Sequence, residues 1–171
     1  MLMTWTTRPE TPADIPAIHA LVAAAFPTAD EAHLVDALRA DQDAWIDGLS
    51  MLAVDEHGTV TGHALLTRCH IDGTPALALA PCAVLPAAQR TGAGTAAIHA
   101  VLDAARARRR ENLVVVLGHA SYYPRFGFTR ASGFGITAPI EVPDDALMAL
   151  ALDPRQPVPA GTIRWAQAFG I

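Results

Sequence analysis

The sequence predicts a mixed α/β fold in which a central twisted sheet is flanked by helices, and three observations predict it. Segments with apolar residues at helical spacing are interleaved with short β-favouring segments. Residues 112–117 (NLVVVL) form a continuous apolar run, which is typical of a strand buried on both faces. An apolar segment that ends at Leu85 leads through a glycine-containing turn into a long helical segment. This order of elements favours a mixed sheet.

Two helices are expected near the N-terminus. Thr11 has the character of an N-cap, and Pro12 then occupies the first helical position. The buried stripe of this helix comprises Ile15, Ile18, Leu21, Val22 and Phe26. A second helix is expected over residues 31–40, capped by Thr28 or Asp30.

The rest of the chain is expected to supply most of the sheet. The expected strands cover residues 4–8, 50–55, 59–71, 76–85, 112–117 and 162–165, with one or two more strands after residue 132. A long helix is expected over residues 92–109, and short helices within 118–128 and near 144–150. Pro81 lacks a backbone N–H, so it predicts a bulge or an edge in its strand.

Length and composition limit the possible classes of protein. The 171 residues fit a single domain over 1–171, with a core at about 4–135 and a C-terminal segment at about 136–171. With 51% hydrophobic and 17% charged residues, the chain is not of the disordered class. The net charge of -5 argues against nucleic-acid binding, because phosphate contacts dominate that affinity.

The two cysteines, Cys69 and Cys82, are too few for a disulfide scaffold or a zinc cage. No pair among the seven histidines has the spacing of a metal site, so no metal is expected. The N-terminal residues do not resemble a signal peptide, and the longest apolar run falls far short of the ~20 residues that a membrane span needs. We therefore expect a cytoplasmic protein without a membrane partner.

The turn around Gly92 and Gly94 predicts an anion site. Free N–H groups in the first turn of a helix point at one spot, and the helix dipole adds partial positive charge there. Glycines let a phosphate approach the backbone closely, and Arg90 can add a charged hydrogen bond. The P-loop lysine and the full dinucleotide-binding fingerprint are both missing. Taken alone, the two glycines are equally consistent with a tight structural turn.

The wider pattern resembles a known family. Residues 84–94 read V-x-P-x-x-Q-x-x-G-x-G, which resembles motif A of the GNAT acetyltransferase superfamily. One strand later, residues 122–128 (YYPRFGF) resemble the second signature of that family. The stretch LGHASYYPRFGF, with EVPDDALMAL downstream, is similar to the YhbS-like group of predicted N-acetyltransferases. The resemblance covers about residues 4–128 and implies a GNAT-type fold.

The resemblance implies acetyl-CoA as cosubstrate. Its pyrophosphate would lie on the backbone amides of residues 90–95, and its pantetheine arm between two splayed strands, those ending at Leu85 and Leu117. Many members have an asparagine near residue 121; here Ser121 replaces that contact or caps the short helix. The residues implied in binding the cosubstrate are Cys82, Ala83, Val84, Gln89, Arg90, Thr91, Gly92, Ala93, Gly94, Thr95, Ser121 and Tyr122.

The resemblance also implies catalytic roles. Tyr123 aligns with the general acid of the family, and the backbone amide of Val84 would contact the thioester carbonyl. A buried aromatic with a satisfied hydroxyl is the structural alternative for Tyr123. The general base is open: the options are His119, Glu31, His63 and a chain of water molecules.

The implied function is transfer of an acetyl group to a primary amine of a small molecule or peptide, by direct attack in a ternary complex. A non-catalytic acyl-CoA-binding sensor or partner domain is the alternative. The acceptor site would come from about residues 26–40 and 132–171, and a homodimer is possible.

Two groups of charged residues are more simply explained by helix ends than by ligand binding or catalysis. The arginines over residues 106–110 close a helix, where cations complement the dipole, although a contact with the adenosine 3′-phosphate is an alternative. Asp144 and Asp145 are expected to begin a short helix rather than to act as a catalytic pair.

Overall fold

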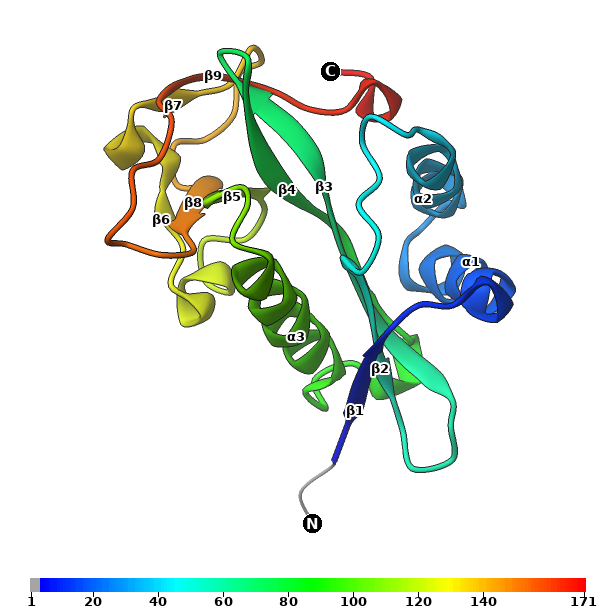
Figure 1. Cartoon of the computed structure of the whole chain (residues 1–171). Helices are drawn as coiled ribbons and strands as arrows, with labels where there is room; N and C mark the ends of the chain where they lie inside the picture. Colours follow the sequence, from blue (N-terminus) through cyan, green and yellow to red (C-terminus); the bar gives the residue numbers. More distant parts are fainter. Residues whose placement is uncertain (1–3) are drawn as a thin grey trace.

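A mixed sheet with helices on both faces organises residues 4–171, which are the residues that the computed structural model describes. Helices α1 and α2 cover one face of the sheet and α3 covers the other (Figure 1). The helices are α1 (Ile15–Ala25), α2 (Asp30–Ala40) and α3 (Ala93–Arg108). The strands are β1 (Thr6–Pro9), β2 (Ser50–Val54), β3 (Val60–Ile71), β4 (Thr74–Val84), β5 (Leu113–Leu117), β6 (Thr129–Arg130), β7 (Ile136–Thr137), β8 (Leu147–Ala151) and β9 (Gly161–Arg164). The predicted fold class is confirmed.

The sheet opens between β4 and β5. Its main path runs β1-β2-β3-β4-β5-β8-β6, and β4 and β5 are parallel neighbours. They pair only at Leu77 with Val114 and Ala78 with Val115, although β4 continues to Val84 and β5 to Leu117. The two strands therefore diverge toward their carboxyl ends, as the resemblance implies.

Pro81 lies in an irregular part of β4, as its ring predicts. On β3, Ala64 pairs with Cys82 and Leu66 with Leu79, so β4 contains one extra residue over this stretch. An extra residue is the mark of a β-bulge, which bends its strand. The bulge falls where β4 leaves β5.

The expected helix near residues 144–150 is wrong. Leu147–Ala151 is strand β8, which pairs antiparallel with β5 over all five of its residues. Leucine, methionine and alanine favour a helix locally, but the free edge of β5 supplies hydrogen-bond partners that a helix would leave unsatisfied. Asp144 therefore begins no helix; it lies in a turn and pairs with Arg130 of β6 at 3.0 Å.

The N-terminal helices begin slightly differently from the expectation. Pro12–Asp14 is a short 3₁₀ helix, and α1 begins only at Ile15. Ala29, not Thr28 or Asp30, is the N-cap of α2, although Thr28 Oγ1 accepts a hydrogen bond from the Asp30 amide at 3.3 Å. No helix within residues 4–171 has the length and apolar composition that a membrane span requires.

Candidate active site

A cavity of about 620 Å³ lies where the carboxyl end of β4 meets the first turn of α3. It contains most of the residues that the sequence singles out, together with Ile98 and Arg125, which sequence reasoning missed. The lining residues are Cys82, Ala83, Val84, Gln89, Arg90, Gly92, Ala93, Gly94, Thr95, Ile98, Tyr122, Tyr123 and Arg125. Thr91, Ser121 and His119 are not among them.

Several backbone amides at the start of α3 have no backbone acceptor in the described part of the chain. The first helical hydrogen bond runs from Ala96 N to Gly92 O at 2.9 Å. Within residues 4–171, the amides of Arg90 and of residues 92–95 donate to no backbone acceptor. The amide of Thr91 differs from the expectation, because it donates to Ala88 O at 3.3 Å. Five amides and the positive end of the α3 dipole are therefore available to an anion, as the sequence predicts.

Close packing fixes this turn against the sheet. A Cβ on Gly94 would lie 2.8 Å from Cγ2 of Val84, so only glycine lets α3 approach β4 this closely. Gly92 has φ +95°, in the left-handed region that favours glycine. Trp5 Nε1 donates to Thr91 O at 3.2 Å and attaches the turn to the N-terminal segment. The two glycines thus have structural roles that also open the backbone to a ligand.

The amide of Val84 points toward the gap between β4 and β5. Leu85 N donates to Thr61 O on the β3 side at 2.9 Å. Successive N–H groups along a strand point to opposite edges, so the Val84 N–H is directed to the β5 side. Pairing with β5 already ended at Ala78, so this N–H faces the open part of the sheet.

Tyr123 is half-buried beside the same gap. Its ring contacts Tyr122 and Phe128 in edge-to-face geometry, with centroids 5.1 and 6.0 Å away. A Cβ on Gly118 would lie 2.4 Å from Cε2 of Tyr123, so the absence of a side chain there makes room for the ring. Burial, and then the neighbouring Cys82 and Tyr122, raise the pKa of Tyr123 well above its ordinary value. The phenol therefore keeps its proton at neutral pH.

Cys82 lines the cavity next to Tyr123. Burial raises the pKa of its thiol to about 12, although Tyr123 acts in the opposite direction. A thiol that stays protonated is a poor nucleophile. Cys82 is therefore a lining residue.

Tyr122 joins the loop after β5 to α3. Its hydroxyl lies 3.0 Å from Oγ1 of Thr95, and the guanidinium of Arg125 lies 4.3 Å from its ring centroid. Arg125 Nε also donates to Tyr122 O at 2.8 Å, which holds a cation at the cavity. The signal for Arg125 was present in the sequence, since it is the cation within YYPRFGF.

The candidate bases lie in different surroundings. His63 is fully buried, its Nε2 is 2.8 Å from Ser50 Oγ, and burial lowers its pKa to about 3. Glu31 is partly buried, and its Oε2 has no hydrogen-bond partner among residues 4–171. His119 is exposed, and its carbonyl accepts the Tyr122 amide at 3.1 Å. Ser121 is exposed and does not cap the 3₁₀ helix Tyr123–Phe126, whose N-cap is Tyr122 without a side-chain bond.

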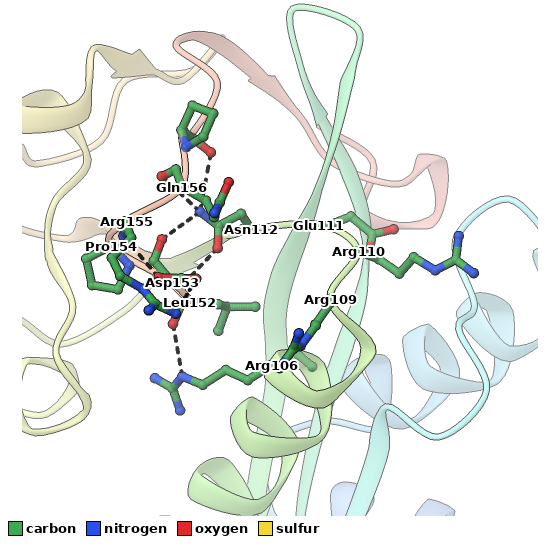
Figure 2. Close-up of a pocket in the computed structure, with 12 residues that line it drawn as sticks. Arg106, Arg109, Arg110, Glu111, Asn112, Leu152, Asp153, Pro154, Arg155 and Gln156 are labelled. Carbon is green, nitrogen blue, oxygen red and sulfur yellow. Dashed lines mark hydrogen bonds and ion pairs between the residues drawn. The ribbon is translucent and has the colours of Figure 1, made fainter.

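A larger cavity of about 850 Å³ lies at the other end of α3 (Figure 2). Arg106, Arg109 and Arg110 line it, and Arg106 Nε donates to Leu152 O at 3.2 Å. A helix with the 16 residues of α3 is about 24 Å long, so these arginines lie far from the anion site. The helix dipole is negative at this end, and the arginines complement it as the simpler interpretation predicts. The smaller cavity is therefore the candidate active site.

Comparison with known proteins places this geometry in a family. Residues 15–128 match the acetyltransferase (GNAT) family. "Uncharacterized N-acetyltransferase YjhQ" of Escherichia coli (strain K12) is 40% identical over 126 residues, covering 71% of this chain and 68% of that protein.

Two solved structures are similar over almost the whole chain. A GNAT family N-acetyltransferase (YhbS) from Escherichia coli, in complex with CoA, has 25% identity and a TM-score of 0.89, covering 100% of this chain and 94% of that one. A GNAT family acetyltransferase from Brucella melitensis, in complex with acetyl-CoA, has 29% identity and a TM-score of 0.78, covering 98% and 99%. This chain therefore belongs to the GNAT family and is an N-acyltransferase.

Proposed function

We propose that this enzyme transfers an acetyl group from acetyl-CoA to a primary amine of a small molecule or peptide, by direct attack in a ternary complex. The observation that carries the proposal is the set of five free amides at the start of α3, next to the gap between β4 and β5. The CoA and acetyl-CoA complexes of the two similar structures support it.

The residues at the turn fit the diphosphate of the cosubstrate. The amides of Arg90 and residues 92–95 supply donors, and Gly92 and Gly94 leave the backbone accessible. Arg125 adds a cation at the cavity. Beyond the diphosphate, the unpaired edge of β4 from Leu79 to Val84 can hydrogen-bond the pantetheine arm. Cys82, Ala83 and Gln89 line the path.

Val84 and Tyr123 fit the chemical step. The Val84 amide donates to the thioester oxygen as negative charge develops there, a contribution of about 3 kcal/mol for one well-placed donor. The amine nitrogen forms the new C–N bond and the C–S bond breaks. Tyr123 gives its proton to the departing sulfur. Because burial raises the pKa of Tyr123, the phenol carries this proton at neutral pH. The nitrogen loses a proton to water as it becomes an amide, and Tyr123 regains a proton from water.

The proton of the acceptor ammonium must leave before attack. His119, Glu31 and a chain of water molecules remain the options for its removal. Neither of these two side chains nor that of His63 lines the cavity, but His63 fits the role least well, because it is 0% exposed whereas His119 is exposed and Glu31 partly buried. The acceptor segments at residues 26–40 and 132–171 and a homodimeric state stay proposals, which an acceptor-soaked crystal and sedimentation can test.

The experiment combines a binding assay with a turnover assay. Acetyl-CoA and CoA are expected to raise the melting temperature, whereas ATP is not. At a ligand concentration of 100 times the dissociation constant, binding stabilises the folded state by about 2.7 kcal/mol. Stabilisation by ATP alone would contradict the proposal. Release of free CoA thiol across a panel of primary amines then measures turnover.

Replacing Tyr123 separates binding from catalysis. Tyr123→Phe keeps the ring that packs against Phe128 and removes the proton donor. We expect turnover to fall by about 10²–10⁴-fold, with the dissociation constant for CoA unchanged. An unchanged turnover rate would show that the tyrosine is only a packing residue.

A further inference from the structure

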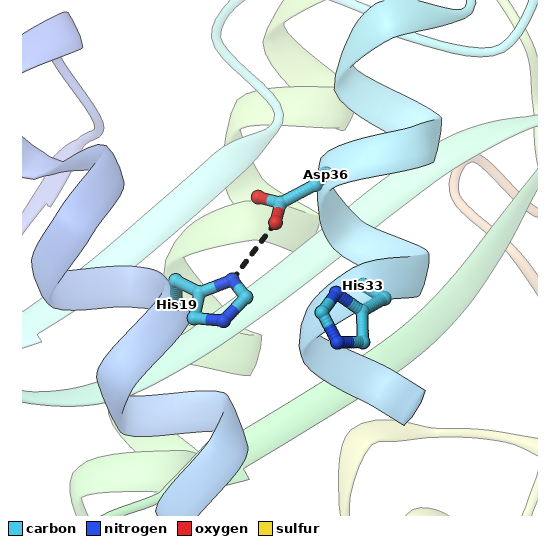
Figure 3. Close-up of side chains that lie close together, drawn as sticks. All are labelled: His19, His33 and Asp36. Carbon is cyan, nitrogen blue, oxygen red and sulfur yellow. Dashed lines mark hydrogen bonds and ion pairs between the residues drawn. The ribbon is translucent and has the colours of Figure 1, made fainter. Parts of the chain in front are cut away.

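The outer surface of the α1–α2 pair carries three potential metal ligands. His19 comes from α1, and His33 and Asp36 come from α2 (Figure 3). Each offers one ligand atom, and these atoms all lie within 4.8 Å of one another. The side chains of His19 and Asp36 are 36% and 44% exposed, and His33 is exposed, so a hydrated ion can reach all three.

Packing of the two helices brings these residues together. His33 and Asp36 are three residues apart on α2, so they share one face of that helix. His19 follows the buried Ile18 on α1, and Ile18 belongs to the same core cluster as Val35 of α2. Because buried residues fix both backbones, the three side chains project from rigid elements, as a selective metal site requires.

The three ligands have the chemistry of a transition-metal site. Two imidazoles and a carboxylate suit Zn²⁺ and its neighbours, with a fourth position left for water. Ligand atoms in a tetrahedral zinc site are about 3.3 Å apart, given metal–ligand bonds of about 2.0–2.1 Å. His19 Nδ1 and Asp36 Oδ2 are 2.8 Å apart and hydrogen-bonded, so an ion that replaces this hydrogen bond requires the two atoms to separate by about 0.5 Å. The exposed ring of His33 also has to approach the pair, since the three ligand atoms lie within 4.8 Å of one another.

The surrounding charges leave one carboxylate oxygen of Asp36 for the ion. Its Oδ1 accepts from Arg39 Nη1 at 3.3 Å, whereas Oδ2 faces His19. The guanidinium of Arg39 also contacts both carboxylate oxygens of Glu10, at 3.1 and 3.0 Å. The charge of Arg39 is therefore largely balanced by Glu10, and Asp36 keeps a negative charge next to the two imidazoles.

We propose that His19, His33 and Asp36 bind one divalent transition-metal ion, with Zn²⁺ the best match, and that the ion clamps α1 to α2. Spacing in the sequence does not indicate this site, because His19 lies on a different helix from His33 and Asp36. The site lies on the opposite face of the sheet from α3, so it is distinct from the acetyl-transfer cavity.

The test is a calorimetric titration of ZnCl₂ into the full chain, freed of any polyhistidine tag and of metal by a chelator. We expect one ion per chain and a higher melting temperature with zinc. Affinity should fall as the pH is lowered, because an imidazole must be neutral to bind a metal ion. Co²⁺ should give the strong visible absorption of a tetrahedral site.

Variants decide whether these residues are the ligands. His33→Gln is expected to weaken zinc binding by about tenfold or more. Because His33 is exposed, the metal-free variant should melt like the wild type. His57→Gln is the control, since the His57 side chain is 79% exposed on another turn, and it should bind zinc normally. Absence of binding, or equal weakening in both variants, would overturn the proposal.

Discussion

The space that the ring of Tyr123 occupies exists because residue 118 has no side chain. In Gly118→Ala the new Cβ would lie 2.4 Å from Cε2 of Tyr123, so the ring must move. A displacement of about 1 Å at a reacting group can cost about 10²-fold in rate. We expect steady-state kinetics to show a loss of kcat of about that size, with KM for acetyl-CoA little changed.

Gly133→Ala is the matched control for this substitution. A Cβ at residue 133 meets no atom within 4 Å, so kcat should remain that of the wild type. If Gly118→Ala also keeps full activity, the position of the Tyr123 ring does not matter for catalysis.

A second residue-scale prediction concerns the buried imidazole of His63. Burial, and then Arg39, lower its pKa to about 3, whereas an unfolded histidine titrates near 6.5. Between these values the unfolded chain binds the extra proton, so stability falls as the pH decreases through that window. The slope for one proton is about 1.4 kcal/mol per pH unit. Urea unfolding of His63→Gln between about pH 6.5 and 5 should show a free energy of unfolding that depends less on pH than that of the wild type. The same pH dependence in both proteins would contradict the lowered pKa of His63.

At the scale of elements, a polar chain joins the N-terminal segment, α2 and the sheet. Arg39 of α2 binds Glu10 in a bidentate pair, and Ser50 Oγ of β2 links Glu10 to His63 of β3. The side chains of Arg39 and Glu10 are only 16% and 12% exposed. Removing one partner of such a pair leaves a buried charge without compensation.

Arg39→Met tests this series of polar contacts, because methionine still provides a long side chain to pack over Trp45. We expect the free energy of unfolding to fall by about 3 kcal/mol, because the Glu10 carboxylate loses its partner. Denaturant titration measures the change. Arg155→Met is the control, since the Arg155 side chain is 87% exposed and its ion pair with Asp153 should contribute little. Equal losses of unfolding free energy in the two variants would show that the buried Arg39–Glu10 pair stabilises the fold no more than an exposed ion pair does.

The pattern of apolar residues along the sequence predicted most of the helices and strands, but not all of them. The strands at residues 50–54 and 113–117 and the helix α3 follow from apolar periodicity, which the chain carries locally. Strand β8 could not be predicted in this way, because Leu147–Ala151 is a strand only by pairing with the edge of β5. Strand β6 has two residues and likewise depends on β8. The single-domain assignment over 1–171 stays a prediction.

At the scale of the whole molecule, two segments distant in sequence form one cavity. The motif around Gly92 and the motif around Tyr123 meet because β4 and β5 are neighbours that diverge after Ala78. Sequence motifs identified these residues, whereas the engagement of the Thr91 amide depends on the turn geometry that only the structure supplies. The grouping of His19 with Asp36 likewise arises only when α1 packs on α2.

The site of the diphosphate is tested most directly by following the backbone amides by ¹H–¹⁵N NMR while CoA is added. The signals of Arg90 and residues 92–95 should shift together and saturate at one CoA per chain. The Thr91 signal should move less, because its N–H already donates to Ala88. If the signals of these five amides do not shift while the signals of residues 106–110 do, CoA binds at the other end of α3 and the proposed site is wrong.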